Sequence, residues 1–146
     1  MKHESTDPEG ECQPVEHTAD MGLHCKAPTL ERLFECAARG MFEIIASLDR
    51  VSLTESAQLS LEAANLEELF VSWLEELLYL WESKRILLSK FTVSSVKSRL
   101  LEAEVAGETY DPSRHELQSE IKAATYHDLR IEHHDDGWEV QVIFDL

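Results

Sequence analysis

The chain has 146 residues, 43% hydrophobic and 29% charged, which is typical of one soluble globular domain. Its 29 Asp and Glu residues against 13 Lys and Arg give a net charge of −16. This balance excludes tight intrinsic binding to nucleic acid, because such binding depends on basic side chains that contact the phosphates. No apolar run approaches about 18 residues and no signal peptide is recognisable, so we predict no membrane span and a cytoplasmic location.

The first thirteen residues are polar, with Glu, Asp, Pro, Gly and Ser and almost no apolar side chain. We therefore predict a flexible tail over residues 1–13 and a single domain over residues 14–146. The three cysteines, Cys12, Cys25 and Cys36, are odd in number and contain no Cys-x-x-Cys pair. We expect reduced thiols rather than a disulfide or a zinc site.

Two helices are predicted from apolar residues at three- and four-residue steps. The first follows Thr29, a favourable N-cap, and extends to Ser47. The second follows Asn65, with Glu68 placed three residues on as its capping-box partner. Its apolar arc of about 200° is wider than a surface helix needs. We therefore expect the second helix to be the most buried element, with Trp73 in the core.

Strands are predicted for the other alternating or apolar segments, and they are separated by residues typical of turns. The expected strands are residues 23–27, 50–63, 86–96, 100–106, 117–126, 128–134 and 138–144. Turns are expected at Gly107, at Asp111-Pro112 and at Asp135-Asp136-Gly137. This order predicts an α+β fold, in which a largely antiparallel β-sheet carries two long helices on one face of a single domain.

The densest group of polar residues is Glu-His-Thr-Ala-Asp-Met-Gly at residues 16–22, just before the first predicted strand. A carboxylate in this position is a suitable ligand for a hard cation such as Ca²⁺ or Mg²⁺. The last predicted strand ends in a second candidate, Asp145. Our hypothesis is that Asp20 and Asp145 lie close together in the folded protein.

The histidines and the search for catalytic motifs indicate a function less clearly than the two aspartates do. His133-His134 beside Asp135-Asp136 resembles a metal-binding tract, but we interpret it as the polar end of a hairpin. The sequence contains no nucleophile elbow, phosphate-binding loop or zinc-protease motif. We expect His17 and His127 to be hydrogen-bonded structural histidines rather than general bases.

Three spaced motifs together resemble the archease family: residues 16–22, residues 120–127 (Glu-Ile-Lys-Ala-Ala-Thr-Tyr-His) and residues 142–146 (Val-Ile-Phe-Asp-Leu). The resemblance covers residues 14–146. It implies a non-catalytic activator of the RtcB-type, GTP-dependent RNA ligase, which joins 2′,3′-cyclic phosphate or 3′-phosphate ends to 5′-hydroxyl ends in tRNA splicing and RNA repair. Such an activator promotes guanylylation of the ligase and keeps it turning over.

The resemblance also implies a divalent cation, expected to be Ca²⁺, with Mg²⁺ and Mn²⁺ as alternatives. Its implied ligands are Asp20, Asp145 and the main-chain oxygen of Leu146. Because the chain ends at Leu146, the terminal carboxylate could replace or supplement that oxygen.

Five further residues of the matched motifs are expected to contact the partner or to take part in activation: Glu16, His17, Lys122, Thr125 and His127. For Lys122, three roles stay open, namely neutralising the acidic pair, contacting the ligase or forming a salt bridge within the sheet.

Two other functional classes compete with the activator. One is a small metal-dependent hydrolase in which Asp20, Asp145 and His17 activate a water molecule. The other is a general chaperone-like binding module. The hydrolase predicts turnover by the isolated protein, and the chaperone predicts action on unrelated clients.

Overall fold

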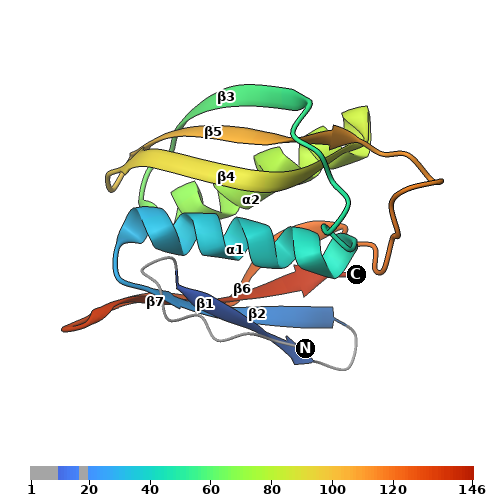
Figure 1. Cartoon of the computed structure of the whole chain (residues 1–146). Helices are drawn as coiled ribbons and strands as arrows, with labels where there is room; N and C mark the ends of the chain where they lie inside the picture. The colour runs from blue at the N-terminus through green and yellow to red at the C-terminus, as the bar shows by residue number, and fades with distance from the viewer. Residues whose placement is uncertain (1–9, 17–19) are drawn as a thin grey trace.

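The computed structural model describes residues 10–16 and 20–146, with backbone alone at positions 15, 16 and 20. Two antiparallel sheets lie on either side of two helices (Figure 1). The first sheet has the order β1 (Glu11–Glu16), β2 (Asp20–Ala27), β7 (Gly137–Asp145) and β6 (Ala123–His134). The second sheet has the order β3 (Glu55–Glu62), β5 (Leu100–Thr109) and β4 (Ile86–Val96). The helices are α1 (Leu30–Ile45) and α2 (Leu66–Lys84).

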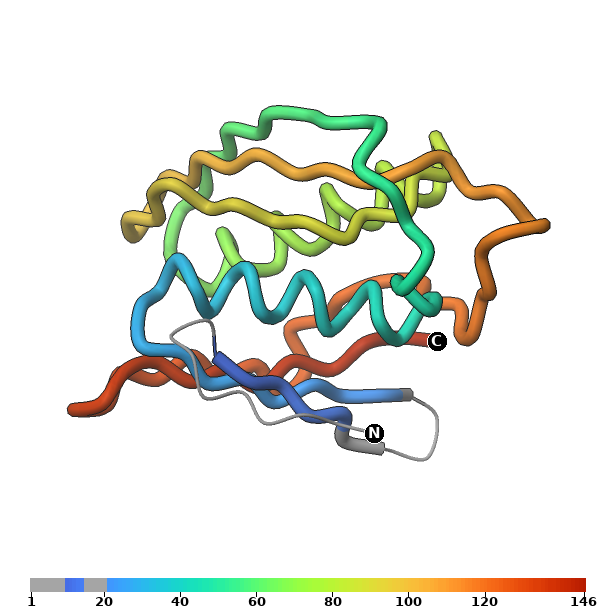
Figure 2. Tube along the Cα trace, in the orientation of Figure 1, coloured from blue at the N-terminus to red at the C-terminus, as the bar shows by residue number. Residues whose placement is uncertain are grey.

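The predicted α+β class, antiparallel pairing and single domain are confirmed, but the strands form two sheets rather than one. Each helix therefore packs between sheets instead of on one face of a single sheet. Helix α1 contacts β2 of one sheet and β4 of the other, and α2 contacts β6 and β4. The Cα trace in Figure 2 shows the same layering.

Helix α1 begins where the sequence predicts, because the Thr29 hydroxyl accepts a hydrogen bond from the Arg32 amide at 3.2 Å. Two of its carboxylates also cover the edge of the second sheet. Glu35 accepts from the Val93 amide at 2.7 Å, and Glu31 accepts from the Val96 amide at 3.1 Å. These bonds satisfy backbone donors that an open edge would leave available for aggregation.

Helix α2 has the predicted N-cap, since the Asn65 side chain accepts from the Glu68 amide at 2.9 Å. The Glu68 carboxylate returns a bond to the Ala64 amide at 2.8 Å, one residue earlier than in a standard capping box. The expectation that α2 is the most buried element is wrong. Nine residues are buried in each helix, and α1 has 16 residues whereas α2 has 19.

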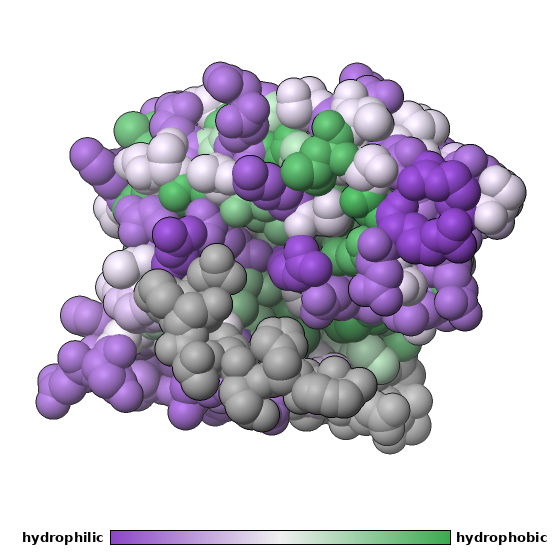
Figure 3. Space-filling view, in the orientation of Figure 1, coloured by the Kyte–Doolittle hydropathy of each residue, from purple (hydrophilic) through white to green (hydrophobic). Residues whose placement is uncertain are grey.

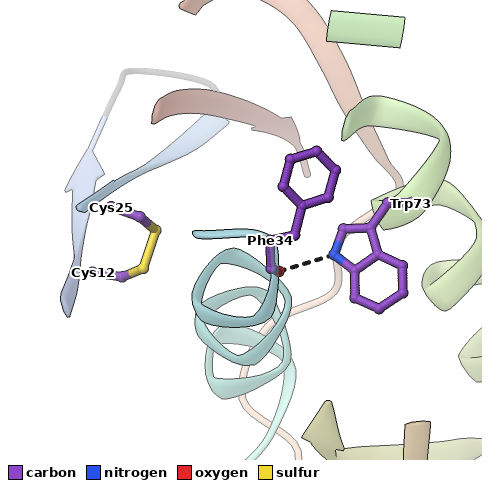
Figure 4. The surroundings of a disulfide bond; sticks show 4 residues. All are labelled: Cys12, Cys25, Phe34 and Trp73. Carbon is purple, nitrogen blue, oxygen red and sulfur yellow. Dashed lines mark hydrogen bonds between the residues drawn. A yellow bond between two sulfur atoms is a disulfide. The ribbon is translucent and has the colours of Figure 1, made fainter. Parts of the chain in front are cut away.

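Trp73 lies in the core as predicted, with its side chain completely buried. Its indole nitrogen donates a hydrogen bond to the Phe34 carbonyl of α1 at 2.9 Å, as Figure 4 shows. The Phe34 ring also packs edge-on against Phe70 of α2, with ring centroids 5.1 Å apart. The two helices are therefore joined by aromatic packing in which the one polar atom of Trp73 has a partner.

The strands of the second sheet agree with the sequence at β4 and differ elsewhere. Strand β3 covers only Glu55–Glu62, so residues 50–54 of the predicted strand are irregular. Strand β5 continues through Gly107, where a turn was expected. A Cβ at Gly107 would lie 1.9 Å from the Leu87 carbonyl oxygen, so glycine is needed there for close strand approach rather than for a turn.

The predicted strand over residues 117–126 is wrong for most of its length. Only a single bridge, Ala46 to Leu117, forms before β6 begins at Ala123. The connecting segment is instead held to the end of α1 by backbone hydrogen bonds, including one from the Gln118 amide to the Ile45 carbonyl at 2.7 Å. These tertiary bonds replace the strand pairing that the apolar pattern suggested.

Strand β6 is one irregular strand instead of two separate ones. Its register with β7 shifts between Thr125 and Arg130, and Asp128 has a left-handed φ of 53°. The irregularity falls where the sequence analysis separated two strands. The hairpin prediction is confirmed: a turn at Asp135 and Asp136 leads to Gly137, whose φ is 142°.

The N-terminal predictions need two corrections. Residues 11–13 belong to β1 rather than to a tail, whereas residues 1–9 lie outside the described part of the chain. Cys12 lies opposite Cys25 in the β1–β2 ladder, and the two form a disulfide across Cα atoms 4.0 Å apart (Figure 4). The expectation of reduced thiols is therefore wrong for this pair. Spacing along the chain could not reveal it, because the contact depends on the strand that was missed.

The surface is mainly polar on the face seen in Figure 3, where hydrophobic side chains form separate patches among hydrophilic ones. Over the residues that the structure describes, neither helix combines the length and the apolar character needed to cross a membrane.

Candidate functional site

The candidate site is the end of the four-stranded sheet where β2 starts and β7 finishes. The β2–β7 register places Asp20 directly opposite Asp145. Asp145 and the terminal Leu146 are both exposed. The expected proximity of the two aspartate positions is thus confirmed for the backbone. Metal binding by Asp20, Asp145 and Leu146 stays a prediction.

Asp145 has a second neighbour across the sheet, because β6 pairs with the other side of β7. Ala123 lies opposite Asp145, and the Lys122 amide donates to the Asp145 carbonyl at 2.8 Å. The Lys122 side chain is exposed. None of the ion pairs among the described residues involves Lys122, so the salt bridge, one of the three roles left open for Lys122, is not found within this part of the chain.

Thr125 and His127 lie together at the irregularity in β6. The Thr125 hydroxyl donates to the Ile143 carbonyl at 2.9 Å and accepts from the His127 amide at 3.2 Å. The His127 ring is exposed, with Nε2 3.4 Å from a carboxylate oxygen of Asp128. Thr125 therefore fixes the irregular segment to β7, beside the exposed His127.

The sequence analysis did not predict the link between α2 and β6. The Glu75 carboxylate accepts a hydrogen bond from the Ala124 amide at 2.6 Å, at the unpaired edge of β6. The neighbouring Tyr126 is exposed, and its pKa is raised first by partial desolvation and then by the negative charges of Glu68 and Glu75. The only sequence signal for Glu75 was a glutamate within the apolar arc of a helix.

Two candidates from the first motif can be placed only in part. Glu16 is the last residue of β1, and its backbone lies opposite Met21. His17 lies outside the described residues. The roles expected for both, including water activation by His17, stay predictions.

The donor set at this sheet end fits a hard divalent cation. Two aspartate positions face each other across one ladder, and like charges in opposed positions repel unless a cation lies between them. All the candidate donors are oxygens, which Ca²⁺ and Mg²⁺ prefer. The chemistry of the residues is therefore consistent with such an ion.

The histidines at the opposite end of the sheet separate into two environments. The His133 ring stacks on Trp138, with centroids 4.3 Å apart. His134 instead faces Glu132 and Glu139, and the three could hold a metal ion. The interpretation of His133-His134 as the polar end of a hairpin therefore fits His133, whereas His134 also lies among possible metal ligands.

These features define a small α+β protein with two helices between antiparallel sheets and an acidic sheet end at its C-terminus. The sequence model of the Archease protein family (MTH1598/TM1083) matches residues 13–146. Protein archease of Methanosarcina acetivorans is 39% identical over 136 residues, covering 90% of this chain and 93% of that protein. Protein archease of Pyrococcus furiosus is 36% identical over 135 residues, covering 90% and 95%. The chain belongs to the archease family.

Solved structures agree with this assignment. The solution structure of Methanobacterium thermoautotrophicum protein 1598 superposes with a TM-score of 0.80 at 31% identity, covering 92% of this chain and 98% of that one. The crystal structure of an archease from Thermotoga maritima, described as a possible chaperone, gives a TM-score of 0.63 at 23% identity. It covers 99% of this chain and 100% of its own, and at that identity it supports the fold alone.

Proposed function

We propose that this protein is a non-catalytic activator of an RtcB-type, GTP-dependent RNA ligase, promoting guanylylation and multiple turnover of the ligase in tRNA splicing or RNA repair. Membership of the archease family supports the class of protein. The observation that carries the proposal is the β2–β7 register, which brings Asp20 of the first motif opposite Asp145 of the last. Two of the three motifs thereby meet at one end of one sheet.

Asp20, Asp145 and the main-chain or terminal oxygen of Leu146 would hold the divalent ion, with Ca²⁺ preferred and Mg²⁺ or Mn²⁺ as alternatives. Two or three protein oxygens fall short of the six to eight that Ca²⁺ takes, so water or partner groups would complete the shell. A bound ion would supply positive charge that attracts phosphate oxygens. The exposure of Asp145 and Leu146 leaves room for such groups to approach.

The partner surface would be a ligase protein rather than RNA. The net charge of −16 opposes direct contact with RNA phosphates, whereas an acidic protein can dock on a complementary basic surface. Glu16, His17, Lys122, Thr125 and His127 would contact the ligase around the ion. We place this interaction in the cytoplasm, where the ligase would act.

An RNA ligation assay with this protein at substoichiometric amounts distinguishes the three functional classes. The activator raises ligation beyond one round and shows no turnover without ligase. A metal-dependent hydrolase would instead cleave phosphoester substrates alone. A chaperone would protect unrelated aggregating clients and would raise ligation only in proportion to ligase recovered from aggregates. Unchanged ligation with fully soluble ligase would contradict the proposal.

A further inference from the structure

The β6–β7 hairpin carries a second group of metal-ligating side chains, at the end of the sheet opposite Asp145. The hairpin projects from the body of the protein in Figures 1 and 2, and its projecting end is hydrophilic in Figure 3. Glu132 and Glu139 are directly opposed in the ladder. His134 follows Glu132 by two residues, and side chains two apart on a strand share a face. The fold therefore brings Glu132, His134 and Glu139 to one face.

The side-chain atoms of these residues converge. His134 Nε2 lies 2.7 Å from Glu139 Oε1 and 3.5 Å from Glu132 Oε1. One ligand atom from each of the three residues lies within 4.8 Å of the others. Ligands at about 2.0–2.2 Å from a tetrahedral zinc ion are separated by about 3.5 Å. Only a small adjustment of exposed side chains would close this group around the ion.

A second histidine orients the group from the neighbouring strand. His24 Nε2 of β2 lies 2.5 Å from Glu139 Oε2, so the two oxygens of Glu139 face different histidines. One oxygen is held by His24 while the other points toward His134. Partners of this kind around a metal site fix the orientation of the ligands and strengthen binding.

The surroundings favour a cation with an open coordination position. Opposed carboxylates such as Glu132 and Glu139 repel in the absence of positive charge. Lys26 lies opposite Glu139 on its other side and supplies part of that charge. His134 and Glu139 also line a pocket of about 360 Å³ shared with Lys26 and Trp138. The pocket provides space for water or another small ligand beside His134 and Glu139.

We propose that Glu132, His134 and Glu139 form a zinc site, with His24 as a positioning residue. The presence of imidazole nitrogen distinguishes this group from the all-oxygen set at the other end of the sheet, because nitrogen favours Zn²⁺ over Ca²⁺ and Mg²⁺. The two sites would thus select different ions.

The test is a Zn²⁺ titration of the 146-residue protein against a chromophoric chelator, with circular dichroism to verify the fold of each variant. We expect His134→Gln to weaken binding by more than the ~10–100-fold expected for His24→Gln, which removes only an orienting partner. His133→Gln is the matched control, because that ring stacks on Trp138 instead of facing the carboxylates.

Asp145→Asn tests independence from the candidate Ca²⁺ site and should leave Zn²⁺ affinity unchanged. Three results would overturn the proposal. They are Zn²⁺ binding that His134→Gln leaves unaffected, Zn²⁺ binding that His133→Gln weakens as much as His134→Gln does, and loss of Zn²⁺ binding in folded Asp145→Asn.

Discussion

The interior between the two sheets and the ends of the four-stranded sheet differ in what holds them together. In the interior, apolar side chains are closely packed, and the one polar atom of Trp73 bonds to the Phe34 carbonyl. At the sheet ends, by contrast, ionisable side chains such as those of Asp145, Glu132 and His134 are exposed. Stability and candidate chemistry are thus separated in space, and changes at the two locations should have separable effects.

The two ends of that sheet also differ from each other. Asp20 and Asp145 provide oxygen donors at one end, whereas His134 joins Glu132 and Glu139 at the other. The strand register creates both groups by aligning residues distant in sequence. Ligand type would then decide which ion each end binds.

The largest expected effect on stability is at Trp73. Trp73→Ala should lower the free energy of unfolding by about 3–5 kcal/mol, because it leaves a cavity and removes an interhelix hydrogen bond. Urea denaturation measures the change. Tyr79→Ala on the same helix is the control, since Tyr79 is 58% exposed. A loss below about 1 kcal/mol for Trp73→Ala would contradict its core role.

Removing the Cys12–Cys25 disulfide should have the next largest effect. It closes a loop with a sequence separation of 13, for which chain entropy predicts about 3 kcal/mol. Thermal unfolding with and without a dithiol reductant measures the difference. Cys12→Ser should abolish the effect of the reductant, and Cys36→Ser, which lies outside the disulfide, should preserve it. Equal melting temperatures of the wild type in both conditions would contradict a stabilising disulfide.

A smaller, pH-dependent effect is expected at Glu108, in the network that holds the segment leading to β6. Hydrogen bonds from Arg114, from the Ser52 amide and from buried His115 lower the pKa of Glu108 from 4.5 to about 2. A lowered pKa in the folded state means that this stabilisation is present above pH 4.5 and is lost as the pH falls toward 2.

Glu108→Gln should therefore reduce the slope of stability against pH in that acid range. Urea midpoints across the range provide the measurement. Glu104→Gln, on the exposed face of the same strand, should keep the wild-type slope. Identical slopes for wild type and Glu108→Gln would show that the network does not contribute.

The smallest effect on stability is expected for Lys122→Met, which keeps most of the aliphatic stem and removes the charge. Because Lys122 is exposed and forms no ion pair with the described residues, the free energy of unfolding should change by less than about 0.5 kcal/mol. If Lys122 assists activation, the rate of ligase guanylylation should nevertheless fall. An unchanged rate of ligase guanylylation would show that Lys122 does not assist activation.

Local signals predicted the helices and the last hairpin well. Thr29 and Asn65 cap the helices because their side chains meet amides three residues away, and Gly137 adopts the positive φ that the turn requires. Such features depend on neighbouring residues alone. For the same reason, the sequence could place Asp20 and Asp145 near the ends of two strands, although β2 begins at Asp20 itself, three residues before the predicted strand.

Features that depend on distant partners were harder to predict. Which strands pair decides three of these features: the division into two sheets, the inclusion of residues 11–13 in β1 and the Cys12–Cys25 disulfide. The bond from Ala124 to Glu75 likewise depends on how α2 lies against β6. The proposed zinc site of Glu132, His134 and Glu139 could not be predicted from the sequence, because Glu132 and Glu139 become neighbours only in the β6–β7 register.

We propose that the end of the sheet that carries Asp20 and Asp145 activates a ligase without supporting the fold. The most direct test measures guanylylation of an RtcB-type ligase with wild-type protein, Asp20→Ala and Asp145→Asn, and uses Asp135→Asn as a control for the loss of one exposed negative charge. We predict that the first two variants lose activation while their unfolding free energies stay within about 0.5 kcal/mol of wild type or rise, because each removes a repelling charge. Asp135→Asn should activate normally. Full activation by Asp20→Ala and Asp145→Asn, or unfolding of these variants, would contradict a functional site at this end of the sheet.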